Sequence, residues 1–352
     1  MEPITHFLFG ATLGRAGLNR KTALATATLT LAAEAPDLDV FGRVFGSSAF
    51  GFEHHRGFTH SFLGLPLVAA VVVGFMYCVW RLRGRKTRDP NLPPKWGILF
   101  AYAYLAGVSH ILLDFTNNYG VRPFWPISER WYSWDIVFVI EPVLLAILIL
   151  GLVTPGLFSL ISEEVGARRK GPQGRAGALS ALVLVGAFWG LRDYEHRRAT
   201  AALEARTYQS VDPIRVSTYP YMFDPFQWYG VVETPGFFAR MEVRSLTPEV
   251  DPLGDMQIRY KPEETEVTLA AKNTYLGRVY LDWAKYPIAE AEEVRRNDGS
   301  TGYVVRFRDL RYAYPGRDTR AALGAVVVLN SELRVVSEEF GMRARRPGQD
   351  PR

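Results

Sequence analysis

Cysteine is nearly absent from this chain of 352 residues. The single cysteine, Cys78, lies in an uncharged apolar stretch, so no intrachain disulfide can form and cysteine usage does not indicate a redox compartment. Histidine is also scarce, and only His196 lies beyond residue 110. The sequence contains neither an internal repeat nor a nucleotide-binding glycine motif. Any chemistry that depends on histidine is therefore confined to the N-terminal part.

Long apolar runs are present in the first half of the chain. Residues 61–80 carry no charge and are long enough to cross a hydrocarbon core of roughly 30 Å. Similar runs follow, and we predict spans at about 61–80, 97–115, 136–158 and 176–192. Together with the residues before them, these runs predict a multi-span helical membrane domain over 1–195.

Basic residues gather in the loops between these runs. They account for the net charge of +5, so we expect no nucleic-acid partner. Arginine and lysine in 81–95 and 168–175 place both loops in the cytoplasm by the positive-inside rule. The sequence then predicts a multi-pass protein of the cell inner membrane, with 54–60 and everything after Arg192 outside the cytoplasm. Met1-Glu2-Pro3 lacks the basic region of a signal peptide.

Two shorter apolar stretches precede the first span. Ile4–Leu13 and Ala23–Ala33 are each too short to cross a membrane comfortably. We therefore expect a re-entrant or short helical hairpin over 4–33. Such a hairpin returns His6 and Asp37 to one side of the membrane, where His60 and Asp114 are also expected.

The pattern changes after about residue 207. Short alternating runs separated by Pro, Gly and Asp predict a soluble, β-rich α+β domain over 207–345, which we place outside the cytoplasm. The expected helix is Thr274–Lys285. The expected strands are Trp228–Thr234, Phe237–Leu246, Glu264–Ala271, Tyr303–Leu310, Leu323–Asn330 and Arg334–Phe340.

Histidines and aspartates interrupt the apolar N-terminal sequence at separate points. His110 and Asp114 are four residues apart on a predicted helix and therefore share a face. His60 precedes a span, and Asp37 follows Pro36 where the chain must leave a helix. Imidazole nitrogen and carboxylate oxygen are ligands of zinc and similar ions. We predict a divalent-metal site of one or two ions, preferably zinc, formed by His6, Asp37, His60, His110 and Asp114.

Further polar residues are expected around this site. Asp39 could replace Asp37 as a ligand or accept a hydrogen bond from a ligand histidine. Gly57 permits a tight bend that would direct His55 or Arg56 toward a substrate. The loop 116–135 is rich in tryptophan and tyrosine, and we interpret it as an interfacial aromatic belt, as a lid over the site, or as both. If the loop is a lid, four of its polar residues would contact an anionic substrate or the metal ligands. These residues are Asn117, Asn118, Arg122 and Asp135.

Glu141 lies inside the predicted third span, where a carboxyl group is costly. It could be neutral and hydrogen-bonded, or it could stabilise a helix contact. Alternatively it could be a metal ligand, a group behind the ligands or a general base. We therefore expect either Asp37 or Glu141 to accept the proton of a hydrolytic water.

Several of these motifs occur together in one known family. Pro3-Ile4-Thr5-His6, Ala35-Pro36-Asp37-Leu38-Asp39, His55-Arg56-Gly57-Phe58-Thr59-His60, Ser109-His110, Leu113-Asp114 and Asn117-Asn118-Tyr119-Gly120 resemble the YdjM-like family of inner-membrane metal-dependent hydrolases over about 1–150. The order of ligands is also similar to that of zinc-dependent phospholipase C and the S1/P1 nucleases. This second resemblance implies one ion on Asp37, His60, His110 and Asp114, with Asp114 bridging to another held by His6.

These observations predict a membrane-bound metal-dependent hydrolase, preferably a phosphoesterase, that acts at the outer membrane face. A metal ion there would lower the pKa of water and polarise the scissile bond. Membrane lipid, and a lipid-linked or phosphorylated substrate, are the expected partners, and the oligomeric state is left open. The alternative is a non-catalytic protein with a structural metal and a soluble domain that binds a partner or an envelope polymer.

Overall fold

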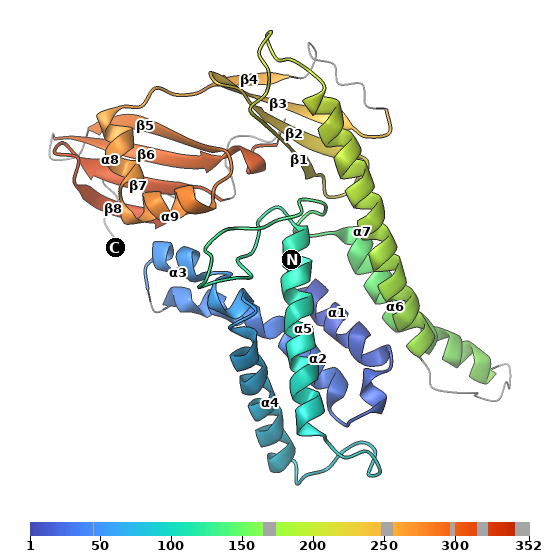
Figure 1. Cartoon of the computed structure of the whole chain (residues 1–352). Helices are drawn as coiled ribbons and strands as arrows, with labels where there is room; N and C mark the ends of the chain where they lie inside the picture. Colours follow the sequence, from blue (N-terminus) through green and yellow to red (C-terminus); the bar gives the residue numbers. More distant parts are fainter. Residues whose placement is uncertain (45, 165–173, 248–255, 296–299, 315–322, 342–352) are drawn as a thin grey trace. The chain divides into compact units, whose positions relative to one another are not determined.

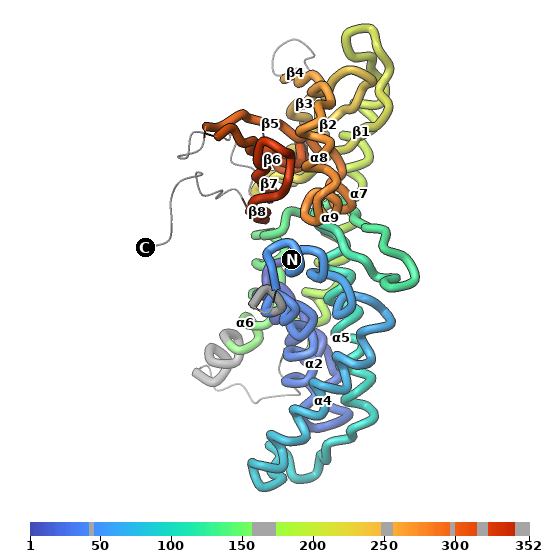
Figure 2. The backbone as a smooth tube through the Cα atoms, turned by 90° about the vertical axis from the view of Figure 1, so that its left-hand side faces the viewer, coloured from blue at the N-terminus to red at the C-terminus, as the bar shows by residue number. Residues whose placement is uncertain are grey.

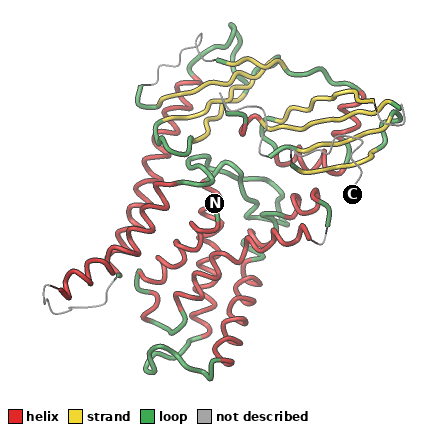
Figure 3. The backbone as a smooth tube through the Cα atoms, turned by 180° about the vertical axis from the view of Figure 1, so that it is seen from behind, coloured by secondary structure: helices red, strands yellow, loops and turns green. Residues whose placement is uncertain are grey.

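The chain divides into a helical unit and a β-rich unit, as the sequence predicts (Figures 1 and 3). The computed structural model describes residues 1–352 except 45, 165–173, 248–255, 296–299, 315–322 and 342–352. The helical unit contains residues 1–39, 56–196 and 220–225, and the β-rich unit contains 40–55, 197–219 and 226–352. The predicted fold class, a helical membrane-type region followed by an α+β domain, is therefore confirmed.

The helical unit is built from α-helices and short 3₁₀ turns. Helices α2, α4 and α5 lie side by side, with α1 against α2 (Figures 1 and 2). Its elements are α1 (Pro3–Arg15), η1 (Leu18–Arg20), α2 (Ala25–Glu34), η2 (Ala35–Val44), η3 (Phe58–His60), α4 (Leu65–Leu82), α5 (Trp96–Thr116), α6 (Pro142–Glu164) and α7 (Arg175–Glu204). Some terminal residues of η2 and α7 group with the β-rich unit.

Helices α1 and α2 form a closely packed hairpin. A Cβ atom added to Gly10 would lie 2.7 Å from the carbonyl oxygen of Leu29, so only glycine permits this approach of the two backbones. Gly14 packs equally closely on Thr26. The hairpin brings His6, in the second turn of α1, to the end of the unit where α2 terminates at Glu34.

Small and aliphatic side chains fill the interior between α2, α4 and α5. Ala32, Ala69 and Ala103 are among these buried residues, and their small size lets the helices approach one another. The outer face of α4 is different, because Leu67, Val71 and Phe75 are each more than half exposed. An exposed apolar stripe with a spacing of four residues is typical of a helix that faces lipid.

Three helices in the described part of the chain are long and apolar enough to cross a membrane. They are Leu65–Leu82, Trp96–Thr116 and Arg175–Glu204. The apolar part of α6, Pro142–Gly156, is shorter. Helix α6 begins at Pro142, because proline favours the first helical position, and Glu141 therefore precedes the helix.

The β-rich unit contains two four-stranded sheets, in the orders β1-β2-β3-β4 and β5-β6-β7-β8. Antiparallel pairing joins β2 to β3, β3 to β4, and each neighbouring pair of the second sheet. The strands are β1 (Arg215–Pro220), β2 (Gln227–Glu233), β3 (Phe237–Arg244), β4 (Gln257–Tyr260), β5 (Pro287–Arg295), β6 (Thr301–Asp309), β7 (Ala325–Asn330) and β8 (Val335–Phe340).

Two helices that pack on the second sheet differ from the prediction. Helix α8 (Glu266–Lys272) was predicted as a strand, and helix α3 (Ser48–His54) was not predicted. The expected strand Glu264–Ala271 is wrong, because Glu266–Lys272 forms helix α8. Thr265 and Thr268 form a reciprocal capping box there, and this local signal outweighs the alternating pattern. Helix α3 packs on β8 through stacking of Phe52 on Phe340. It packs on α9 (Tyr275–Trp283) through contacts of Phe52 with Tyr280 and Trp283.

Candidate metal centre

Four predicted ligands from three separate segments meet inside the helical unit. Asp37 lies in η2, His60 ends η3, and His110 and Asp114 lie one turn apart on α5. One potential ligand atom from each residue lies within 4.8 Å of every other. The hairpin places Asp37 at this position, because η2 continues directly from the end of α2.

Distances within the cluster fit a single coordination sphere. The Nε2 atoms of His60 and His110 lie 3.0 Å apart. Oδ1 of Asp37 is 3.2 Å from Nε2 of His60 and 3.5 Å from Nε2 of His110. Oδ2 of Asp114 is 3.5 Å from His60 Nε2 and 3.4 Å from His110 Nε2. Metal–ligand bonds of about 2.0–2.2 Å separate neighbouring ligand atoms by about 3 Å, so the four residues fit one ion.

Hydrogen bonds turn both imidazoles so that Nε2 faces the cluster. Nδ1–H of His110 donates to the backbone carbonyl of Ala33 at 2.6 Å. Because a carbonyl can only accept, Nε2 of neutral His110 keeps a lone pair for an ion. Nδ1 of His60 lies 3.0 Å from Oγ1 of Thr59 and 3.3 Å from Oδ2 of Asp39. Such partners behind the ligands fix ring orientation and basicity.

Asp39 also organises the loop that carries His60. Its Oδ2 accepts hydrogen bonds from the backbone N–H of Arg56 and the hydroxyl of Thr59, each at 3.0 Å. The structure thus places Asp39 behind His60, one of the two positions that the sequence allowed. The predicted bend at Gly57 is present and begins at Arg56, which has a positive φ of 56°, while Gly57 has φ −94° and ψ −111°.

The two oxygens of Asp114 have different surroundings. Oδ1 lies 2.9 Å from Nη2 of Arg56 and also contacts the amino group of Met1. Oδ2 has no hydrogen-bond partner among the described residues and faces His60 and His110. One oxygen is therefore held by cations, and the other is left for an ion.

His6 lies beside the four-residue cluster. Its ring stacks on that of His110, with centroids 3.8 Å apart, and its Nε2 is 3.5 Å from Oδ1 of Asp114. The ring is buried, and neither nitrogen has a hydrogen-bond partner in the part of the chain that the structure describes. His6 is thus close to Asp114 but outside the four-residue set.

The loop after α5 supplies several buried polar groups. Asn117 and Asn118 are fully buried, and Nδ2 of Asn117 lies 3.5 Å from Oδ1 of Asp114. Arg122 is buried with its guanidinium 4.6 Å from the ring centroid of Trp131. Asp135 is buried with a positive φ of 60°. His55 groups with the β-rich unit.

Glu141 is buried, and Arg192 is the cation that interacts with it. It is not part of the four-residue set. Nε of Arg192 donates to the carbonyl of Ile136 at 2.7 Å, which fixes this arginine near the start of α6.

Sequence reasoning did not select Glu34, the last residue of α2. Oε1 of Glu34 is buried and has no hydrogen-bond partner among the described residues. Burial, and then the neighbouring charge of Asp37, raise the pKa of Glu34 to about 7, against an opposing effect of His110. The available signal was an acidic residue at the end of an apolar run, three residues before Asp37.

Charges in the cluster determine how its residues bind protons. Burial lowers the pKa of His60, but interactions with Asp114, Asp37 and Asp39 outweigh burial and raise it to about 10. Burial raises the pKa of Asp37, but hydrogen bonds with His110 and His60 outweigh burial and hold it well below its usual range. Asp37 is therefore an anion at neutral pH.

Only one member of the cluster reaches the surface. The side chain of Asp37 is 20% exposed, whereas those of His60, His110 and Asp114 are fully buried. A molecule that reaches the cluster would therefore approach beside Asp37. The fold and the site together define a class of protein. It has a helical unit whose apolar helices can cross a membrane, and this unit contains a buried cluster of histidine and aspartate.

Comparison with known proteins agrees with this class. Residues 1–199 match the family described as YdjM inner membrane protein, and the chain therefore belongs to that family. The chain is 24% identical over 354 residues to "Uncharacterized protein YfhP" of Bacillus subtilis (strain 168), covering 97% of this chain and 95% of that protein. No solved structure matches significantly. All four members of the cluster lie within the family match.

Proposed function

We propose that this protein is a membrane-bound metal-dependent hydrolase that acts on phosphate esters at the extracytoplasmic face of the membrane. The observation that carries the proposal is the convergence of Asp37, His60, His110 and Asp114 around one point, with Nε2 of both histidines turned inward. The four residues fit a divalent ion, and we propose zinc.

A divalent ion at this position would acidify water and polarise the scissile bond. The proton from that water needs an acceptor whose pKa lies near neutrality. Asp37 is a poor acceptor because its pKa is held low. Glu34 has a pKa near 7 and interacts with Asp37 and His110, so we propose Glu34 for this role. Glu141 is the second candidate.

Positive charge beside the cluster supports an anionic substrate. Arg56 is buried, and its Nη atoms are used by Asp114 and by the carbonyl of Gly120. Its Nε–H has no hydrogen-bond partner among the described residues, so one donor remains for a phosphoryl oxygen. Because the helical unit belongs to a family of membrane proteins, we propose a phosphate ester with a lipid portion.

The alternative is a non-catalytic role, and the number of protein ligands in the cluster favours this alternative. Four protein ligands saturate a tetrahedral zinc ion, as in structural sites, whereas a catalytic ion keeps a position for water. The β-rich unit would then bind a partner or an envelope polymer. The partial exposure of Asp37 favours the catalytic reading, because a structural ion needs no route from the surface.

Hydrolysis by the purified full-length protein in detergent tests the proposal. The substrates are phosphomonoesters, phosphodiesters and phospholipids, with added zinc or manganese. Asp114→Asn preserves side-chain volume, and we expect it to lower metal affinity and kcat/KM by at least about a hundredfold. Asp212→Asn, at an exposed aspartate of the β-rich unit, is the matched control. If the wild type hydrolyses nothing and Asp114→Asn loses fold and metal together, the structural alternative replaces the catalytic one.

A further inference from the structure

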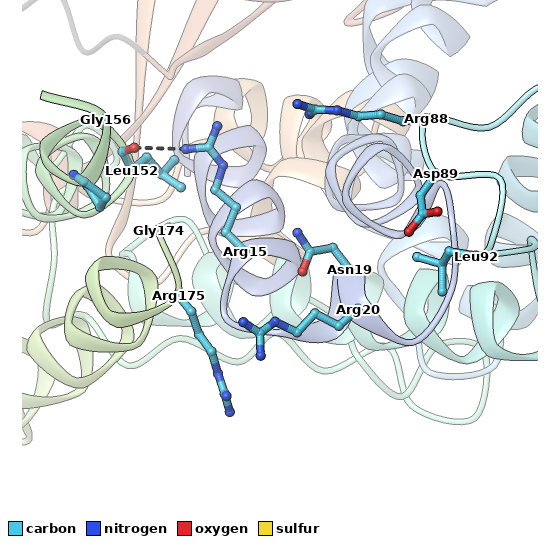
Figure 4. A pocket seen from close by; sticks show the side chains of 11 residues that line it. Arg15, Asn19, Arg20, Arg88, Asp89, Leu92, Leu152, Gly156, Gly174 and Arg175 are labelled. Carbon is cyan, nitrogen blue, oxygen red and sulfur yellow. Dashed lines mark hydrogen bonds between the residues drawn. The ribbon is translucent and has the colours of Figure 1, made fainter. Parts of the chain in front are cut away.

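A second site lies at the opposite end of the helical unit from the metal cluster. His6 lies in the second turn of α1, and Arg15 ends the same helix about 14 Å further along at 1.5 Å per residue. Around Arg15 opens a cavity of about 630 Å³. We call it the arginine cavity. Its lining includes Arg15, Asn19, Arg20, Arg88, Asp89 and Arg175 (Figure 4).

Separate segments contribute the four arginines of this cavity. Arg15 ends α1, Arg20 ends η1, Arg88 belongs to the connection between α4 and α5, and Arg175 begins α7. In Figure 4, Arg15 and Arg20 lie in the middle. Residues of α6 and α7 lie on one side of them, and Arg88 and Asp89 lie on the other. Among the described residues of the lining, Asp89 is the only carboxylate, so these residues carry excess positive charge.

Two of the arginines are fixed in place without being neutralised. Nη1 of Arg15 donates to the carbonyl of Leu152 at 2.9 Å, and Nε of Arg175 donates to the carbonyl of Ala16 at 3.2 Å. A carbonyl acceptor leaves the cationic charge uncompensated. No described carboxylate lies within ion-pair distance of these arginines or of Arg20 and Arg88. The fold therefore gathers four cations that have no carboxylate partner within the part of the chain that the structure describes.

The surroundings of the cavity indicate an amphiphile. Leu92, Leu152 and Pro155 contribute apolar surface to its wall. A second cavity of about 460 Å³ shares Asn19, Arg88, Asp89 and Leu92 with it and continues along Leu24, Ala25 and Ala27 at the start of α2. Two candidate membrane spans begin near this cavity. Helix α7 begins at Arg175, which lines the cavity, and α5 begins at Trp96, eight residues after Arg88. The cavity thus lies at the level where apolar helices enter a membrane.

We propose that the arginine cavity binds the phosphate group of an anionic membrane lipid. The arginines bind the phosphate, and the adjoining cavity along α2 receives the apolar part of the same molecule. Basic pockets between membrane helices bind anionic headgroups in this way. A volume of several hundred Å³ is also usual for a small-molecule site. The site is separate from the metal cluster and does not depend on its activity.

Native mass spectrometry of the full-length protein in detergent tests the proposal, with phosphatidylglycerol, phosphatidylcholine or inorganic phosphate as the probe. The test variant is Arg20→Gln with Arg88→Gln, because neither side chain makes a hydrogen bond within the described residues. The control is Arg83→Gln with Lys86→Gln, exposed on the same connection but outside the cavity. Both variants lose two positive charges, so they differ only in where the charge is removed.

We expect phosphatidylglycerol to bind the test variant about 25-fold more weakly than the wild type, taking about fivefold for each arginine. The control should bind within about twofold of the wild type, and phosphatidylcholine should bind weakly throughout. Equal weakening in test and control variants would overturn the proposal, because any surface charge would then suffice. Displacement of the lipid by an equal concentration of inorganic phosphate would overturn it too, since the site would then take free phosphate. Unchanged metal content in the test variant separates these results from the proposed hydrolase.

Discussion

The Nε2 atoms of His60 and His110 lie 3.0 Å apart, although the two histidines are 50 residues apart in the sequence. Two bonds of about 2.0–2.1 Å that meet at a right angle or a tetrahedral angle hold their nitrogens about 2.8–3.4 Å apart. The contact therefore has the dimension of one edge of a coordination sphere. Asp37 and Asp114 supply oxygens at 3.2–3.5 Å from these nitrogens, which completes the set.

Asp39→Asn tests the group behind His60. Asp39 accepts from Thr59 and Arg56 and lies 3.3 Å from Nδ1 of His60, so it orients a ligand without being one of the four. We expect metal affinity to fall about 10- to 100-fold, as for other partners behind metal ligands. Competition with a fluorescent chelator measures this affinity. Affinity equal to that of the wild type would show that the imidazole of His60 is held without Asp39.

Glu34→Gln tests the proton acceptor. We expect metal content to stay the same while kcat falls on the order of a hundredfold, because general-base catalysis contributes factors of this size. Glu141→Gln is the matched comparison, since it removes the same charge from the other candidate. A fall in kcat for Glu141→Gln, with Glu34→Gln unchanged, would assign the role to Glu141.

Metal affinity should depend on pH through His60. The pKa of His60 is raised to about 10 when no ion is bound, so a proton occupies its ring at neutral pH. An ion must displace this proton, and apparent affinity should rise about tenfold per pH unit as pH increases toward 10. The raised pKa also stabilises the metal-free fold below about pH 6.5, and this contribution is lost as pH rises through 10. Titrations at pH 6, 7 and 8 with equal apparent affinity would contradict the proposed role of His60.

Reporter fusions test the predicted topology. A fusion at Arg88 should report the cytoplasm, and one near Asp350, outside the described residues, should report the extracytoplasmic side. The basis is the excess of arginine and lysine in 81–95. Identical signals from the two fusions would reject the assignment and would place the β-rich unit with the 81–95 loop.

Much of the candidate metal site could be predicted from the sequence because its residues interrupt apolar sequence at separate points. Asp37, His60, His110 and Asp114 are costly in such surroundings, and the i, i+4 spacing of the last two indicates a shared face. Glu34 was missed because one carboxylate at a helix end is also typical of a solvated terminus. The role that we propose for Glu34 rests on its interactions with Asp37 and His110 at the end of α2.

The fold class was predictable, but some local elements were not. The alternation in Glu264–Ala271 favours a strand, yet the capping box of Thr265 and Thr268 starts a helix. Helix α3 was missed because it is only 7 residues long, too short for a helical pattern to be recognised. Phe52 is buried against the rings of Tyr280, Trp283 and Phe340, all more than 200 residues further along the sequence. Contacts between residues so far apart in the sequence leave no pattern in the local sequence.

Metal content is the most direct test of the claim that this cluster binds an ion. Purified wild type, His110→Gln and His54→Gln would be dialysed together against one zinc buffer and measured by elemental mass spectrometry. His54 is an exposed histidine of α3, so His54→Gln controls for the loss of any imidazole. We predict one or two ions per chain in the wild type and in His54→Gln, and at least one ion fewer in His110→Gln. Equal metal content in all three proteins would contradict the site.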